Sequence, residues 1–254
     1  MSLMMNPFIS FPTSAAFSPE AVEFDGTNDY LTHTGSFTGA ADNKFITVSA
    51  WFWLDSLAIQ RTILATAANG HIQVRVNASG KPDLHAHSTP GFEGCIAMES
   101  SNILTVGTQY HILYSADCAD VAKCFGYVNE AALTFSAKLI TDANIKWTGG
   151  QDHLIGTMFN FGSLMDGSLG EVYMTNEWLD ISLLANRRKF INADGTPADL
   201  GSDGSTPTGT QPLLYMKGEA ADWNAGTANA GSGGTMTMTG AVVDSAHEPM
   251  DISP

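Results

Sequence analysis

Acidic side chains at alternate positions are the first residues in this sequence whose types and spacing could do chemistry. Glu23 and Asp25 lie two residues apart, and alternate residues of a strand point to the same face of a sheet. Two carboxyl groups on one face can act as nucleophile and general acid in glycoside hydrolysis. The third acid of a Glu-x-Asp-x-x-Glu pattern would fall at Asn28, and Glu171 stands alone on its predicted strand. The sequence therefore predicts no catalytic residues and no enzymatic activity.

Oxygen- and nitrogen-bearing side chains also raise the question of a metal site. Asp25, Asn28 and Asp29 form an oxygen-rich segment, and calcium prefers hard oxygen ligands. The same residue types are typical of plain turns, which is the interpretation we prefer. His85 and His87 share one face of a predicted strand and make half a metal site. No third ligand is tied to them by sequence, so we expect solvent-facing histidines, no metal and no cofactor.

Two aromatic residues have the spacing of a sugar-binding platform. Trp51 and Trp53 point to the same face of a strand predicted over residues 45–54. Exposed indole rings can stack on sugars, whereas buried ones belong to the core beneath a covering loop. We favour the buried arrangement. The Gly-x-Ser-x-Gly motif of serine hydrolases does not occur in the sequence.

The charge balance and the cysteines restrict partners and compartment. The 254 residues carry 11 Lys and Arg against 26 Asp and Glu, a net charge of −15. Nucleic-acid binding needs clustered cations, and an anionic membrane repels acidic chains, so we expect neither partner. The single basic run, 187–189, lies near the end of a predicted helix, where cations suit the helix dipole. Cys95, Cys118 and Cys124 are expected to be buried free thiols, although a bridge between Cys118 and Cys124 is conceivable. No signal peptide is apparent.

Short strands separated by turn residues dominate the chain. Residues 45–54 alternate most clearly, with Ile46, Val48, Ala50, Phe52 and Leu54 on one face. Further strands are predicted within residues 21–31, 62–67, 71–77, 84–87, 110–116, 123–128, 153–159, 169–175, 212–217 and 235–243, and Asn129 and Glu130 are predicted as a hairpin tip. One helix is predicted over residues 181–191 with Asp180 as its N-cap, and residues 90–102 are predicted as a loop. Many short strands with one helix indicate an all-β sandwich.

Four segments resemble the LamG-like branch of the concanavalin A-like jelly-roll family. They are AVEFDGTNDYL at 21–31, FITVSAWFWLD at 45–55, QYHILYSADCADVAKCFGYVNEAAL at 109–133 and HLIGTMFNFGSLMDGSLGEVYMTNEWLD at 153–180. The resemblance covers residues 21–243 and implies a jelly-roll β-sandwich with one short helix and extended terminal segments. It also implies that Asp166 and Gly167 approach the Asp25 turn, where LamG-like domains often hold calcium. Because this fold hosts lectins, glucanases and structural modules, the resemblance does not specify a function.

The expected organisation has three parts. Residues 1–20 form an extended arm, residues 21–243 form the sandwich with a long surface loop at 192–210, and residues 244–254 form a C-terminal tail. The arm carries Phe8, Phe11 and Phe17, which we expect to fill pockets on a neighbouring subunit.

Two functions remain open from the sequence. The segment 212–243 is similar to LamG-like proteins of tailed bacteriophages. This resemblance predicts a non-enzymatic structural or decoration protein of a virion, assembled in the host cytoplasm with other capsid or tail proteins and with copies of itself. The alternative is a carbohydrate-binding module, with receptor binding as one such role, which predicts an exposed aromatic platform beside polar side chains and a glycan as partner.

Overall fold

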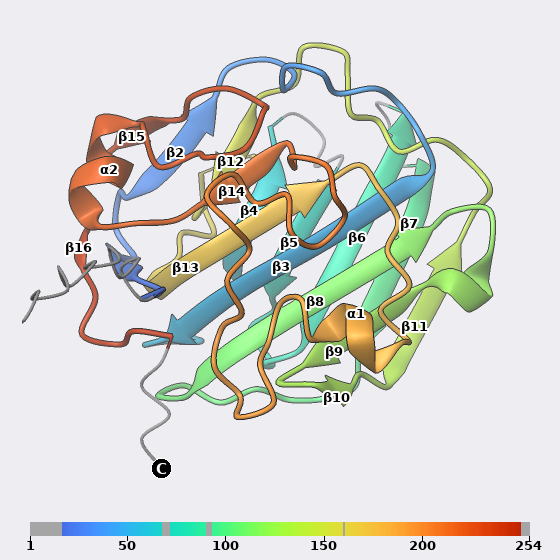
Figure 1. Cartoon of the computed structure of the whole chain (residues 1–254), viewed down its shortest axis with the longest axis horizontal. Coiled ribbons are helices and arrows are strands. Elements are labelled where there is room, and N and C mark those ends of the chain that lie inside the picture. Colours follow the sequence, from blue (N-terminus) through green and yellow to red (C-terminus); the bar gives the residue numbers. More distant parts are fainter. Residues whose placement is uncertain (1–16, 68–71, 90–92, 160, 250–254) are drawn as a thin grey trace, which may run out of the picture.

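Two antiparallel sheets packed face to face form the body of the molecule (Figure 1). The computed structural model describes residues 17–67, 72–89, 93–159 and 161–249. Within these ranges no helix has both the length and the apolar character needed to cross a membrane. The predicted all-β sandwich is confirmed.

The first sheet, sheet A, has the strand order β10-β9-β8-β3-β13-β1-β16, and β14 pairs with part of β13. Its strands are β1 (Ala21–Asp25), β3 (Phe45–Leu54), β8 (Gln109–Asp117), β9 (Phe125–Val128), β10 (Ala131–Ala132), β13 (Asp166–Thr175), β14 (Leu214–Met216) and β16 (Val243–Asp244). The long strands β3, β8 and β13 lie at its centre.

The second sheet, sheet B, has the order β11-β7-β6-β5-β4-β12-β2-β15. Its strands are β2 (Tyr30–His33), β4 (Arg61–Thr66), β5 (Ile72–Val76), β6 (Pro82–Thr89), β7 (Glu93–Ser100), β11 (Phe135–Ile140), β12 (His153–Ile155) and β15 (Thr237–Thr239). The helical elements are η1 (Val121–Lys123), α1 (Leu184–Arg187) and α2 (Ala220–Ala225).

The main core lies between the two sheets. The alternation predicted for residues 45–54 is confirmed, because Ile46, Val48, Ala50, Phe52 and Leu54 are all fully buried there. The opposite side of β3 lies on the outer face of sheet A. The sequence alternation therefore assigned the two faces of the central strand correctly.

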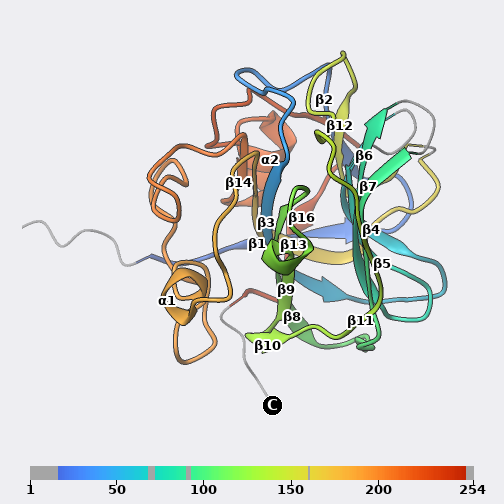
Figure 2. The same cartoon turned by 90° about the vertical axis from the view of Figure 1, so that its right-hand side faces the viewer.

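A third layer covers the outer face of sheet A. The segment that contains α1 and the loop at 192–210 lies across this face, and Figure 2 shows it in orange beside sheet A. A second apolar cluster seals the layer onto the sheet, and its members are Leu113, Tyr173, Ile181, Phe190, Leu200 and Tyr215. The predicted surface loop therefore has no helix or strand, yet Leu200 within it is buried.

The predicted hairpin tip after β9 is present. Asn129 and Glu130 link β9 to β10 as a two-residue turn, with φ angles of 45° and 67°. Positive φ at both turn residues matches the right-handed twist of the flanking strands.

Two predicted elements are wrong in type or extent. Residues 90–102 were expected to form a loop, but Glu93–Ser100 is strand β7, whose pairing with β6 shifts register twice and so lacks the usual alternation. The helix expected over 181–191 is limited to Leu184–Arg187. Asp180 accepts hydrogen bonds from the backbone N–H and the hydroxyl of Ser182 instead of capping a helix.

The C-terminal part also differs from expectation. The single strand predicted over 235–243 is divided into β15 and β16, which belong to different sheets. Gly240 lies between them at a φ of 78°, and a Cβ there would lie 2.1 Å from the Asp29 carboxylate. Helix α2 was not predicted. Residues 245–248, expected in an extended tail, contact β1 through a hydrogen bond from Ser245 N–H to Ala21 O of 3.0 Å.

Candidate functional site

The structure keeps the Glu23 carboxylate apart from Glu171, the acid that stands alone on its strand. Glu23 pairs in register with Ser168, three residues before Glu171 on β13, so the strand rise places the two positions roughly 10 Å apart. The Glu23 carboxylate accepts a hydrogen bond of 2.8 Å from Ser245 Oγ. Burial and the neighbouring Asp55 raise the pKa of Glu23 to about 7. Asp25 caps its own turn, accepting from the N–H of Thr27 at 2.8 Å.

The oxygen-rich turn does meet the strand that the family resemblance implied. Asp25 pairs in register with Asp166, but the carboxylates there already have partners. Asp166 forms a 2.8 Å ion pair with Arg61, and Asp29 accepts from the N–H groups of Asp25 and Ala241 at 3.1 and 2.9 Å. Within the described residues no group of three or more His, Cys, Asp or Glu is arranged to hold a metal. These contacts support the turn interpretation.

His85 belongs to a polar network on sheet B, and His87 on the same strand is half-buried. The imidazole of His85 lies 3.6 Å from Asp83, which also makes a 2.8 Å ion pair with Arg75. Burial and the Arg75 charge lower the pKa of His85 to about 4, so the ring is neutral at pH 7. His85 is half-buried rather than freely exposed.

The two tryptophans of β3 have different surroundings. Trp51 is 3% exposed and stacks on His111 with 4.8 Å between ring centroids, which confirms the buried arrangement. Trp53 is partly exposed, and His247 stacks on it at 3.9 Å. Neither tryptophan forms an open platform.

The cysteines lie in the interior of the fold, and the basic run makes contacts on its covering layer. All three cysteines are buried free thiols, as predicted. The side chain of Cys95 contacts that of Cys118. The basic run lies at the end of α1, as predicted, with Arg187 in the last turn and Arg188 as the C-cap. It also makes contacts that hold the covering layer. Arg188 pairs with Glu130 at the hairpin tip, and Lys189 Nζ donates to Pro207 O at 2.8 Å.

An open groove lies where the covering layer meets one end of sheet A. We call it the aromatic groove, and its volume is about 480 Å³. The residues that line it include Phe45, Asp117, Lys123, Glu177, Trp178, Lys189 and Thr208. They come from the start of β3, the end of β8, η1, the segment after β13 and the covering layer, so only the tertiary fold brings them together.

The aromatic side chains of this groove are held in place and remain accessible. Phe45 is 37% exposed, and Trp178 is partly exposed. Trp178 Nε1 donates to Lys123 O at 2.8 Å, and Lys123 Nζ lies 5.5 Å from the ring centroid. The backbone beside Trp178 is fixed because Thr47 Oγ1 donates to Glu177 O at 2.8 Å. The indole therefore has a defined orientation without being buried.

Charged groups of both signs surround these rings. Asp117 and Glu177 supply carboxylates, whereas Lys123 and Lys189 supply ammonium groups. Lys123 Nζ lies 3.5 Å from the Asp117 carboxylate. Such a mixture can accept from and donate to hydroxyl groups while the rings contact apolar surface. Local sequence patterns do not reveal this site, because Trp178 and Phe45 lie far apart in the chain and no local spacing connects them.

Solved structures resemble the chain, although no family model and no curated protein sequence matches it. A putative carbohydrate binding protein from Bacteroides ovatus has a TM-score of 0.58 at 15% identity, covering 90% of this chain and 60% of its own. The CBM40 of Ruminococcus gnavus IT-sialidase, bound to α2,3-sialyllactose, has a TM-score of 0.46 at 14% identity, covering 66% and 97%. Domains LG4-5 of the mouse laminin α1 chain have a TM-score of 0.47 at 11% identity, covering 72% and 49%.

Identities this low show the fold alone. The chain spans only 60% of the length of the Bacteroides ovatus protein. The activity of that whole protein is therefore not assigned to this chain. The structural neighbours are pentraxin, carbohydrate-binding and laminin G domains. The two packed antiparallel sheets, together with the fold shared with the Bacteroides ovatus protein, confirm the concanavalin A-like jelly roll that the sequence motifs predicted.

Proposed function

We propose that the protein is a non-enzymatic carbohydrate-binding module that takes its ligand in the aromatic groove. The observation that carries this proposal is the presence of two accessible aromatic side chains, Phe45 and Trp178, beside hydrogen-bonding groups in one groove. Sugar rings combine apolar C–H faces with hydroxyl edges, so a site for them needs both kinds of surface. The fold shared with the putative carbohydrate binding protein is consistent with this function.

The charges of the groove indicate the class of sugar. Two carboxylates, from Asp117 and Glu177, face two ammonium groups, from Lys123 and Lys189. Because the charges balance, the groove has no strong preference for an anionic or a cationic ligand. Carboxylates accept strong hydrogen bonds from hydroxyl groups, and ammonium groups donate them. We therefore infer that the ligand is a glycan of neutral hexose units.

Replacing Trp178 tests this proposal. We expect Trp178→Ala to weaken glycan binding at least tenfold, about 1.4 kcal/mol, because the stacking surface is lost. A glycan array with the full chain would identify a ligand, and calorimetry would compare variants on it.

Trp53→Ala is the matched control for that experiment. Trp53 is also partly exposed, but it lies eight residues along β3 from Phe45, a distance of roughly 27 Å. This variant should bind as the unmodified chain does. Equal losses in both variants, or no glycan bound by the unmodified chain, would contradict the proposal.

A structural role on a bacteriophage particle is our second proposal, and it rests on the sequence resemblance of residues 212–243. The arm was expected to place Phe8, Phe11 and Phe17 on a partner. Phe8 and Phe11 lie outside the described residues, whereas half-buried Phe17 lines a pocket on its own sandwich. Apart from that resemblance, the proposal is supported only by the sequence of residues 1–16, which carries Phe8 and Phe11.

Particle incorporation tests the second proposal. Deleting residues 1–16 leaves Phe17 in place, so we expect an unchanged thermal midpoint and reduced incorporation into particles. Equal incorporation of the full and shortened chains would count against it.

A further inference from the structure

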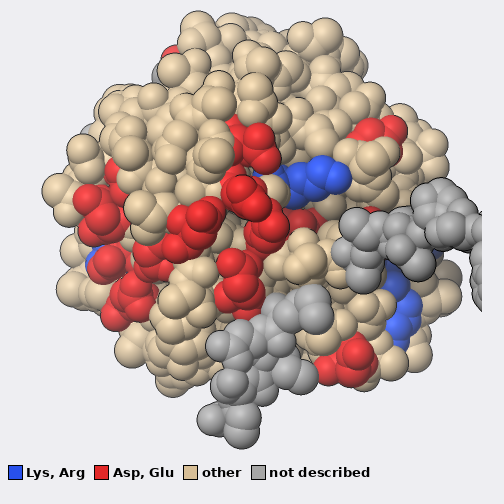
Figure 3. All heavy atoms as spheres, turned by 60° about the vertical axis from the view of Figure 1, so that its left-hand side comes forward, with Lys and Arg blue, Asp and Glu red and all other residues tan. Residues whose placement is uncertain are grey.

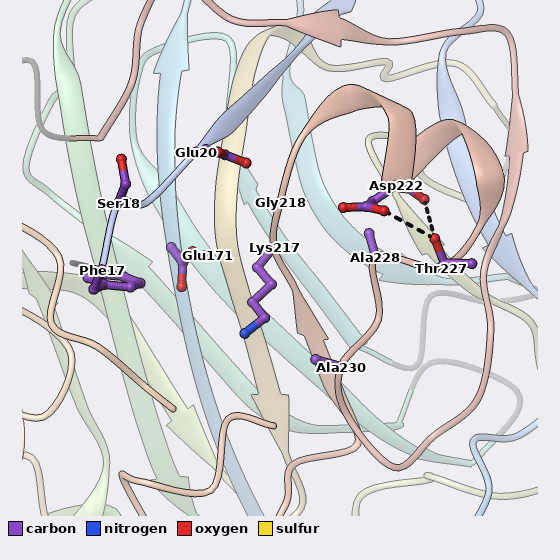
Figure 4. Close-up of a pocket in the computed structure, with 10 residues that line it drawn as sticks. All are labelled: Phe17, Ser18, Glu20, Glu171, Lys217, Gly218, Asp222, Thr227, Ala228 and Ala230. Atoms are coloured by element: carbon purple, nitrogen blue, oxygen red, sulfur yellow. Dashed lines mark hydrogen bonds between the residues drawn. The ribbon is translucent and has the colours of Figure 1, made fainter. Parts of the chain in front are cut away.

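A second cavity lies on the outer side of sheet A, between the start of β1 and helix α2 (Figure 4). We call it the acidic pocket, and its volume is about 370 Å³. The residues that define it are Phe17, Glu20, Glu171, Lys217, Asp222 and Thr227. It shares no lining residue with the aromatic groove, so the two cavities are separate sites.

Glu171 is the deepest polar side chain of this pocket. Its residue is only 3% exposed, yet it lines the cavity. One carboxylate oxygen, Oε2, accepts a 2.5 Å hydrogen bond from Tyr215 Oη. No hydrogen bond reaches the other oxygen, Oε1, from any part of the chain that the structure describes. Glu171 therefore has one carboxylate oxygen that can accept a hydrogen bond from a ligand in the pocket.

The backbone at Glu171 is in an unusual conformation that directs its side chain. Its φ is 48°, in the left-handed region that residues other than glycine adopt at a cost. The register of β13 against β3 shifts between Gly170 and Tyr173, so Glu171 lies in a β-bulge. Such local strain clusters at binding sites. Bulges of this kind re-aim a side chain, here toward the pocket.

Ionisation of Glu171 lowers the stability of the fold at neutral pH. Burial raises its pKa to about 7 from an ordinary value of 4.5, while the Tyr215 hydrogen bond and Lys217 act against this rise and Asp199 and Glu20 add to it. A carboxyl group whose pKa is raised by folding stabilises the fold below pH 4.5. That contribution disappears as the pH rises through 7. Glutamine at this position would avoid this cost.

The surroundings make the pocket attractive to a cation. Glu20 and Asp222 add carboxylates to the lining against a single cation, Lys217. Lys217 Nζ is directed to Gly201 O at 3.3 Å. Further acids lie near Glu20 and raise its pKa, namely Glu219 and Asp244. Figure 3 shows acidic side chains gathered in a band across this side of the molecule.

We propose that the acidic pocket binds a primary ammonium group carried by a small organic molecule, with Glu171 Oε1 as its principal acceptor. An ammonium group has three donors and no acceptor, so it satisfies the free oxygen without opposing the Tyr215 hydrogen bond. Phe17 gives the pocket an aromatic wall for the alkyl portion of the ligand and a ring face for the cation. Glu20 and Asp222 complete a negative lining.

Binding through this carboxylate is linked to protonation. The protonated Glu171 carboxyl carries no charge, so the cation binds the ionised form and displaces the proton to solvent. The ligand's ammonium group keeps its charge up to about pH 10. Affinity should therefore rise with pH through the pKa of Glu171 and level off above it. The groups facing Glu171 are Tyr215, Lys217, Glu20 and Asp199, and Glu20 titrates as well, so a Glu171 variant is needed to assign the effect.

The test is calorimetry on the full chain with two probes that differ by one charge. The cationic probe is Nα-acetyl-L-lysine N-methylamide, and the neutral probe is its Nε-acetyl derivative. We expect the cationic probe to bind at least tenfold more tightly. With a pKa of about 7 for Glu171, its Kd should be about tenfold lower at pH 8 than at pH 6. Equal binding of the two probes, or no saturable binding of either, would overturn the proposal.

Variants assign the effect to the pocket. Glu171→Gln should weaken the cationic probe at least tenfold and flatten its pH dependence, with a thermal midpoint at pH 8 that is not lowered. Glu219→Gln, which removes an acid of the same face outside the lining, should change the Kd by less than about twofold. If Glu171→Gln does not fold, Lys217→Gln provides the test. Removing the Lys217 cation, which competes with the ligand, must tighten binding of the cationic probe at pH 8.

The result is independent of the proposed glycan function. Trp178→Ala lies in the other cavity and should leave amine binding unchanged. Unchanged affinity for the cationic probe in folded Glu171→Gln would refute the pocket assignment whatever the glycan experiments show.

Discussion

Phe52→Ala is expected to lower the free energy of unfolding by about 3–5 kcal/mol, the range for large aromatic truncations in cores. Phe52 is fully buried between the two sheets. Its ring lies 5.7 Å from that of Tyr110 on the neighbouring strand β8. Truncation to alanine removes apolar area from the core and leaves a cavity that the two rigid sheets cannot close. Denaturant unfolding followed by tryptophan fluorescence measures the loss.

Phe45→Ala is the control for that measurement. Phe45 begins the same strand but is 37% exposed, so its truncation should cost less than about 1 kcal/mol. Equal losses for the two variants would show that the face assignment of β3 is wrong. Phe45→Ala should nevertheless weaken glycan binding, because the ring lines the aromatic groove.

Gly167→Ala is expected to cost about 3 kcal/mol or more, at the upper end of what steric overpacking costs. Gly167 has a φ of 128° on β13, and a Cβ built there would lie 2.1 Å from Trp53 O. The obstacle is the backbone of central strand β3, which cannot move without breaking the pairing of the two strands. A large fall in the thermal midpoint is the expected observation.

A second glycine separates the clash from the conformational cost. Gly195 also has a positive φ, 86°, but nothing lies within 4 Å of a Cβ built there. Gly195→Ala should therefore cost only the left-handed conformation, roughly 1 kcal/mol. If Gly167→Ala cost no more than this control, the close packing of β13 on β3 would be in error.

Local patterns in the sequence were sufficient wherever a feature depends on neighbouring residues. The alternation of residues 45–54 requires one buried face, and that face includes Phe52. Asn129 and Glu130 form the predicted turn because asparagine tolerates positive φ. These features follow from side-chain period and backbone preference, which act over a few residues.

Where strand pairing is irregular, local patterns predicted the wrong element. Strand β7 was predicted as a loop because two register shifts against β6 break the period of two. Helix α1 is shorter than predicted, and Leu183 and Leu184 at its start are exposed instead of packing on an apolar face. A bulge or an exposed leucine is decided by the partner strand or the covering layer, neither of which is adjacent in sequence.

The sequence by itself determined the all-β class, the family resemblance, the faces of the central strand and the lack of a paired-carboxylate motif. Only the tertiary structure decided which side chains share a cavity. Trp178 meets Phe45 because the segment after β13 passes the start of β3. Glu171 becomes a buried acid because a bulge turns it and a distant strand supplies Tyr215. Burial, and the shift in pKa that burial causes, depends on atoms far away in the sequence, so no local pattern reports it.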